Sequence, residues 1–118
     1  EGLLMRAETL LAQAQPLSGN RRLAVSFEEL DAALLRELAS KLVQTPGVIA
    51  LLGAKNGGQS IYVFGRAADV DADMGALLRE SAKAFGGKGG GSREMIQGRA
   101  SADGEKIRQF INSLYFSL

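Results

Sequence analysis

Five glycines stand among six consecutive residues in the stretch GGKGGG at 86–91, and Lys88 is the sixth residue. Glycine loses more backbone entropy on folding than any other residue, so a run this dense destabilises ordered structure unless the backbone needs it. A helix is expected to close at Phe85 before the run, and a buried strand is expected to open with Met95 and Ile96 after it. Because core residues hold both ends, the run is predicted to be an ordered loop rather than a slack linker.

An ordered glycine loop leaves two interpretations open. Its N–H groups can point into open space, with positive φ at some residues, and receive an anion such as phosphate. Alternatively, the glycines only permit a tight crossover between a helix and a strand. Charge favours the first interpretation, because positions 83–99 carry four cations against Glu94 alone in a chain of net charge +1. Cations in this arrangement are expected to line a groove for a polyanion. They are Lys83, Lys88, Arg93 and Arg99.

Composition removes several classes of site. The chain has 118 residues, 46% of them hydrophobic, which predicts one folded domain with a core of its own. It contains neither cysteine nor histidine, which excludes disulfides, thiolate ligands and imidazole chemistry. No apolar run approaches the ~18 residues of a membrane span, so no membrane partner is expected. The glycine run also differs from a phosphate-binding P-loop, since Lys88 is followed by glycines and a strand rather than by Ser or Thr and a helix.

The first half of the chain predicts two helices and a strand between them. Apolar residues at helical spacing indicate a helix over 2–15 that ends at Pro16. This helix is interpreted as an inter-domain connector or a dimer contact, or alternatively as an element packed on its own domain. A short strand is centred on 23–25, and Ser26 with Glu29 forms a capping-box pattern for the next helix. The buried face of that second helix is predicted to carry Leu30, Leu34, Leu38 and Leu42.

The second half predicts a hairpin, two helices and a strand. Two apolar runs around the turn signal NGG indicate the hairpin, with a loop longer than two residues. A helix is expected from near Asp71 to Phe85, with acidic residues at its N-terminus, where the helix dipole favours negative charge. A strand over 94–100 and a last helix capped by Asp103 complete the chain. The acidic residues are Asp69, Asp71 and Asp73, and the dipole explains them better than a metal site does. The last helix is expected to bury Ile107, Phe110, Ile111 and Leu114.

This order of elements predicts an α/β fold. After the first helix it reads β-α-β-β-α-loop-β-α, which indicates a mixed sheet of about four to five strands flanked by helices. Residues 1–20 are expected to form a connector helix and a turn, and residues 21–118 the main domain. Because the chain opens within a helical pattern, we expect it to be part of a longer, cytoplasmic protein.

The stretch GGKGGGSREMIQG at 86–98 resembles the glycine motif of the DHH-associated domain, and the element order from about Arg22 onward fits that family as well. The family includes the C-terminal module of alanyl-tRNA synthetases and of the long AlaX-type alanyl-tRNA editing proteins. Departures from the motif are Arg93 for a common proline, Ile96 for a small residue and Arg99 for a frequent glycine. The residues that fit it are Gly86, Gly87, Lys88, Gly89, Gly90, Gly91, Glu94, Met95, Gln97 and Gly98.

The resemblance implies a non-catalytic tRNA-binding C-terminal domain of an alanyl-tRNA synthetase or an alanyl-tRNA editing protein. The expected partner is an alanine-accepting tRNA, and a homodimer through the first helix is a further expectation. No cofactor is expected in this stretch, whereas the missing catalytic domain of the parent ligase or deacylase would carry zinc. The expected nucleic-acid-binding residues are Gly86, Gly87, Lys88, Gly89, Gly90, Gly91, Ser92, Arg93, Gln97 and Arg99.

The alternative within the same family is the substrate-binding subdomain of a DHH-family phosphoesterase that acts on nucleotides or oligonucleotides. In that branch a histidine follows the glycines directly, and here that position is Ser92. The chain therefore resembles the tRNA-linked branch more closely. Tyr62, Tyr115 and Phe116 are further candidates for stacking on bases, although core packing explains such residues equally well.

Overall fold

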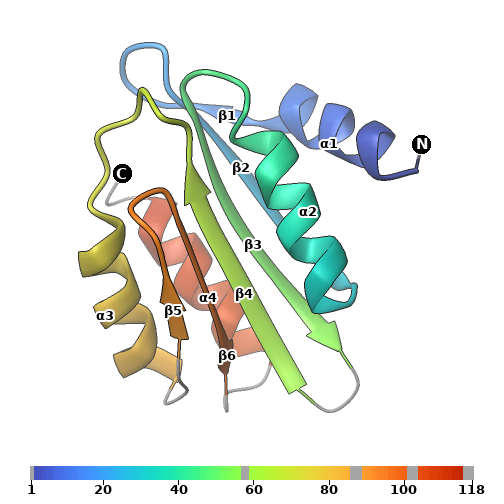
Figure 1. Ribbon diagram of the computed structural model, residues 1–118, viewed down its shortest axis with the longest axis vertical. Helices are drawn as coiled ribbons and strands as arrows, with labels where there is room; N and C mark the ends of the chain where they lie inside the picture. Colours follow the sequence, from blue (N-terminus) through green and yellow to red (C-terminus); the bar gives the residue numbers. More distant parts are fainter. Residues whose placement is uncertain (1, 57–58, 86–88, 101–103, 116–118) are drawn as a thin grey trace.

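The computed structural model describes residues 2–56, 59–85, 89–100 and 104–115. The helices in these ranges are α1 (Gly2–Gln13), α2 (Ala32–Leu42), α3 (Met74–Phe85) and α4 (Gly104–Tyr115). The strands are β1 (Gln15–Pro16), β2 (Arg22–Glu29), β3 (Val48–Asn56), β4 (Gln59–Arg66), β5 (Gly89–Gly91) and β6 (Met95–Ala100). They form one sheet in the order β1-β2-β3-β4-β6-β5, in which only the β2–β3 pair is parallel (Figure 1). The predicted α/β fold with a mixed sheet is confirmed, and the strands beyond the expected four to five are the very short β1 and β5.

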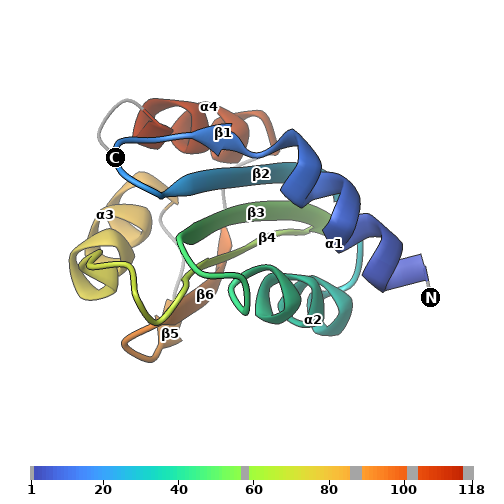
Figure 2. The same ribbon diagram turned by 90° about the horizontal axis from the view of Figure 1, so that it is seen from above.

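The helices lie on both faces of the sheet, with α4 on one side and α2 on the other (Figure 2). Strand β3 is buried on both faces from Val48 to Ala54, as expected for a strand between two covered layers. Along β4 the side chains alternate, so that Tyr62 and Phe64 pack with α3 and α4 while Ile61 packs with α2. Two apolar clusters thus share the sheet. Each described helix is too short or too polar to cross a lipid bilayer.

Helix α2 begins later than the sequence predicts. Ser26 lies inside β2, which continues to Glu29 in parallel register with β3. The N-cap is Asp31, whose Oδ1 accepts a hydrogen bond from the N–H of Leu34 at 2.8 Å. The capping box at Ser26 is therefore wrong, because it is a local signal, whereas pairing with β3 satisfies the backbone of four more residues. In the predicted leucine stripe Leu34 is exposed, and Leu35 takes its place in the core.

The predicted hairpin is confirmed as β3–β4. Asn56 pairs with Gln59, so two residues separate the strands, and the loop is shorter than predicted. Helix α3 begins at Met74 because Asp73 Oδ1 accepts the N–H of Ala76 at 3.0 Å. The carboxylate of Asp69 accepts the N–H of Gly47, 22 residues earlier in the chain, at 3.0 Å, so Asp73 caps the helix and Asp69 joins two loops.

The two terminal helices each bury one apolar stripe. In α1, Ala7 and Leu10 are buried against α2 and the sheet, while Leu4 and Met5 remain exposed. The interpretation in which this helix packs on its own domain therefore holds for Ala7 and Leu10. In α4, three of the four predicted core residues are buried and Phe110 is partly buried. The predicted cap at Asp103 lies outside the described residues.

Candidate nucleic-acid interface

The second half of the glycine run forms an edge strand rather than a loop. Gly89, Gly90 and Gly91 make up β5, which pairs antiparallel with Gly98, Gln97 and Ile96 of β6, respectively. The predicted loop is therefore wrong for these three residues, whereas 86–88 lie outside the described residues. A strand of three glycines has no side chain to pack, so the pairing with β6 holds it in place.

Close packing explains two of these three glycines. A Cβ on Gly89 would lie 2.6 Å from the hydroxyl oxygen of Tyr62, and a Cβ on Gly91 would lie 2.6 Å from Ile96 Cα and against the carbonyl oxygen of Met95. Gly90 differs, because no heavy atom lies within 4 Å of the position that its Cβ would take. Tight packing thus accounts for Gly89 and Gly91, and Gly90 faces open space.

The turn between β5 and β6 uses one of the amides that were predicted to receive phosphate. Ser92 donates its N–H to the carbonyl of Met95 at 2.8 Å, and Ser92 Oγ accepts the N–H of Met95 at 3.3 Å. Hydrogen-bonded and non-bonded pairs alternate along an antiparallel ladder, so the N–H of Gly90 also faces β6. The N–H groups of Gly89 and Gly91 then face the free edge of the sheet. Fewer backbone N–H groups are therefore available to bind phosphate than the sequence predicts, because those of Ser92 and Gly90 point into the β5–β6 hairpin.

A groove of about 450 Å³ lies between helix α2 and the last strands of the sheet. Of the predicted site residues it brings together Gly89, Gly90, Gln97 and Arg99. The side chains of Gln97 and Arg99 are exposed, since they alternate with Ile96 and Ala100, which point into the core on the other face. The remaining described residues that line it are Ala32, Arg36, Ile61, Tyr62, Val63 and Gly98.

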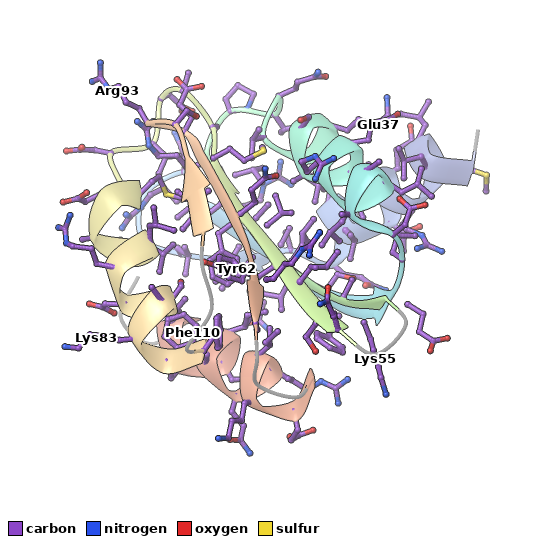
Figure 3. The ribbon with its side chains drawn as sticks, turned by 60° about the horizontal axis from the view of Figure 1, so that its bottom comes forward. Glu37, Lys55, Tyr62, Lys83, Arg93 and Phe110 are labelled. Atoms are coloured by element: carbon purple, nitrogen blue, oxygen red, sulfur yellow. The ribbon has the colours of Figure 1, made fainter. Side chains whose placement is uncertain are left out.

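The predicted residues at the tip of the hairpin lie apart from this groove. Ser92 and Arg93 line a separate hollow with Arg66, Ala68 and Glu94. Figure 3 shows Arg93 at this tip, at the opposite end of β6 from Arg99. Arg66 is held there by a hydrogen bond from Nη1 to its neighbour's carbonyl at 3.2 Å. The predicted site therefore divides into a groove beside α2 and a basic tip, joined by β5 and β6.

Arg36 is the groove residue that the sequence did not reveal. It follows Leu35 on α2 and reads as an ordinary solvated charge of an amphipathic helix. Ala32, one helical turn earlier, lines the same groove, and together they form its helical wall. Arg36 and Arg99 line the same groove only because the folded sheet brings α2 alongside β6. The helical spacing of Ala32 and Arg36 was a signal, but nothing in the sequence placed that face next to the glycine motif.

The ring of Tyr62 belongs to the core, although the residue also lines the groove. Its ring is buried, with its centroid 4.9 Å from that of Phe64 and 5.3 Å from that of Phe85. The interpretation of Tyr62 as a stacking platform for bases is therefore wrong. Its buried hydroxyl has no hydrogen-bond partner among the described residues, and burial raises the pKa of Tyr62 above its ordinary value. The side chains of Tyr115 and Phe116 lie outside the described set.

Known protein families and sequences match most of this chain. The DHHA1 domain family matches residues 20–115. The chain is 37% identical over 114 residues to an alanine–tRNA ligase of Myxococcus xanthus (strain DK1622), covering 92% of this chain and 12% of the ligase. It is 40% identical over 96 residues to the alanine–tRNA ligase of Anaeromyxobacter dehalogenans (strain 2CP-C), covering 78% of this chain and 10% of that ligase. The chain thus spans about a tenth of the length of these relatives.

A solved structure shares the fold. The C-Ala domain from Aquifex aeolicus alanyl-tRNA synthetase superimposes with a TM-score of 0.73 at 26% sequence identity. The match covers 86% of this chain and 93% of that domain. The similarity therefore extends over most of this chain.

Proposed function

Because the chain belongs to the DHHA1 domain family, we propose that it is the non-catalytic tRNA-binding C-terminal domain of an alanyl-tRNA synthetase. Its relatives are alanine–tRNA ligases, and the similar solved domain comes from an alanyl-tRNA synthetase. Ligation and any zinc-dependent chemistry belong to other domains of the longer cytoplasmic protein. The relatives give no support to the phosphoesterase alternative.

The observation that carries this proposal is the uncovered face of β5 and β6. There Gln97, Arg99 and Gly90 meet Arg36 in one groove, and no acidic residue is among the described residues that line it. Cations that converge on a groove attract a polyanion, and backbone N–H groups at a free strand edge can donate to its phosphate oxygens. RNA backbone is a ligand that satisfies both features.

Each predicted site residue has a role in the proposal. The N–H groups of Gly89 and Gly91 donate to phosphate oxygens, and Gln97 bonds to ribose or backbone. Arg93 and Arg99 supply attraction from the two ends of β6. Ser92 fixes the turn that presents Arg93. Gly86, Gly87 and Lys88 keep the roles that their motif implies, as further phosphate contacts.

The proposed partner is an alanine-accepting tRNA, and a second copy of the chain is a further proposed partner through α1. Exposed Leu4 and Met5 on that helix support the second proposal, because apolar side chains in water favour association. Sedimentation of the chain with and without residues 1–15 tests it. A dimer that becomes a monomer on truncation supports the contact, and an unchanged mass contradicts it.

Filter binding of tRNA at several salt concentrations tests the proposed function. Three or four phosphate contacts predict a slope of log K against log[salt] of roughly −3. Replacing Lys88 and Arg93 by alanine removes two cations and is expected to flatten the slope by roughly 1.5. Arg79→Ala is the matched control, because Arg79 is exposed on α3, which packs on the other face of the sheet. A salt-independent affinity, or equal losses in all variants, would contradict the proposal.

A further inference from the structure

The floor of the groove beside α2 is formed by the last three strands of the sheet, β4, β6 and β5. Ile61 and Val63 of β4 form its apolar part, and Gly90 and Gly98 of the two last strands form the rest. Gly90 has no side chain and its Cβ position faces open space, so a ligand can approach the backbone there. Gly98 alternates with Gln97 and Arg99 along β6, so only its backbone lines the groove. A planar group can therefore lie directly on this part of the sheet.

One end of this floor is closed by two side chains. A Cβ on Gly65 would lie 3.1 Å from Met95 Cε and 3.2 Å from Val43 Cγ1, so these side chains meet over Gly65. Gly65 pairs with Met95 at the start of β6, whereas Arg99 lies four residues further along that strand. The groove is thus bounded on the Met95 side, and Arg99 stands towards the other end.

The two walls of the groove each present one arginine. Arg36 comes from α2 and Arg99 from β6, and neither makes an ion pair or a side-chain hydrogen bond with any described residue. The side chain of Gln97, two residues before Arg99 on β6, is likewise without a hydrogen bond in the described part of the chain. The nearby carboxylate of Asp31 already accepts the N–H of Leu34 as the cap of α2. Two cations and one amide, each without a side-chain partner among the described residues, therefore line a single space.

The volume of the groove determines whether a duplex or a single nucleotide can enter it. A volume of about 450 Å³ lies within the range of sites for single small molecules. A duplex is far too wide to enter it, whereas one nucleotide extruded from a loop fits. Proteins recognise RNA loops by this route, because unstacked bases expose both their faces and their hydrogen-bonding edges.

We propose that the groove between α2 and β6 holds a single unstacked nucleotide of an RNA loop. Arg36 and Arg99 hold its phosphate from opposite sides, and the base lies on Ile61 and Val63. The Gln97 amide, which offers both a donor and an acceptor, bonds to the edge of the base or to the ribose. This inference rests on the proposed tRNA-binding function and adds to it the α2 wall and the form in which the RNA binds.

Arg36→Ala is the first test, with tRNA affinity measured by filter binding at several salt concentrations. Loss of one phosphate contact is expected to weaken binding roughly fivefold and to flatten the salt slope by about 0.7. Arg36→Lys, which keeps the charge, should recover part of the affinity. Arg79→Ala removes the same charge from an exposed site on α3 and should bind like wild type. Equal affinities for Arg36→Ala and wild type would overturn the inference.

Gly90→Val is the second test, because it fills the groove without removing any charge. No heavy atom lies within 4 Å of the new Cβ, and β-branched residues suit an extended strand, so the fold should persist. The variant is expected to weaken tRNA binding at least tenfold at an unchanged melting temperature. Unaltered binding by a folded Gly90→Val variant would overturn the inference.

Adenosine 5′-monophosphate and inorganic phosphate serve as small probes in an NMR titration of the 118-residue chain. The nucleotide should shift the Gln97 side-chain amide together with Arg36 and Arg99 Nε–H, whereas phosphate should shift the arginines alone. Identical shifts from both probes would mean that the groove binds only phosphate and would contradict the proposed contact of the base with Ile61 and Val63.

The proposed function and the proposed nucleotide site can be contradicted separately. If wild type does not bind tRNA, the proposed function is wrong. If binding depends on Arg93 but not on Arg36 or Gly90, the proposed nucleotide site in the groove is wrong and the proposed function stands.

Discussion

The two faces of the sheet are covered to different extents. On one face α3 and α4 bury Tyr62, Phe64 and Ile96, so the cover reaches β6. On the other face the α1–α2 cluster ends at β4 and Met95, and β6 presents Gln97 and Arg99 to solvent. Neighbouring residues of one strand thus belong to a closed core and to an open surface. This domain thus leaves β5 and β6 uncovered on one face of the sheet, and this bare face carries Gly90, Gln97 and Arg99 of the motif region.

The largest expected effect is a difference in the free energy of unfolding between variants of the covered face and variants of the bare face. Phe64→Ala should lower the free energy of unfolding by about 3–5 kcal/mol, because it opens a cavity on the covered face. Gln97→Ala, on the bare face, should change it by less than about 0.5 kcal/mol. Urea unfolding of both variants measures the difference. Comparable losses would show that the bare face is part of the packed structure after all.

A second pair of variants compares two adjacent glycines of β5, Gly90 and Gly91. Gly91→Ala should cost about 1–3 kcal/mol, because its Cβ would collide with the backbone of Ile96 and Met95. Gly90→Ala should be neutral or stabilising by up to about 1 kcal/mol, since its Cβ enters open space and alanine restricts the unfolded chain. Thermal unfolding and amide exchange in β6 provide the measurements. The reverse order would mean that β5 does not pair as described.

The smallest expected effect concerns pH and the covered face. Burial raises the pKa of Tyr62 in the folded state above that in the unfolded state. The folded protein therefore holds this proton more tightly, and the associated stability is complete below the unfolded pKa and is lost as pH rises through the folded pKa. Above about pH 10, the ordinary pKa of tyrosine, wild type should lose more stability with rising pH than Tyr62→Phe does. Parallel stability curves for the two proteins between pH 8 and 11 would contradict a buried hydroxyl.

The sequence predicted the elements of the covered face more completely than those of the bare face. Apolar periodicity located the β3–β4 hairpin, α3 and α4, because burial of one face imposes that period. Apolar periodicity could not reveal strand β5, because glycines have no side chains that could alternate between polar and apolar. The strand forms only by pairing with β6. The start of α2 was misplaced because the capping signal at Ser26 competes with a ladder that forms only in the folded sheet. Arg36 could not be assigned, as its role depends on which strand lies opposite α2.

An amide chemical-shift map of the 118-residue chain on addition of alanine-accepting tRNA tests the central claim most directly. If the bare face binds RNA, the largest shifts will fall in β5, β6, the tip around Arg93 and the first turns of α2. Residues of α3 and α4 that face solvent will change little. Shifts concentrated on the outer surface of α3 and α4, or along α1 and β2, would contradict the account.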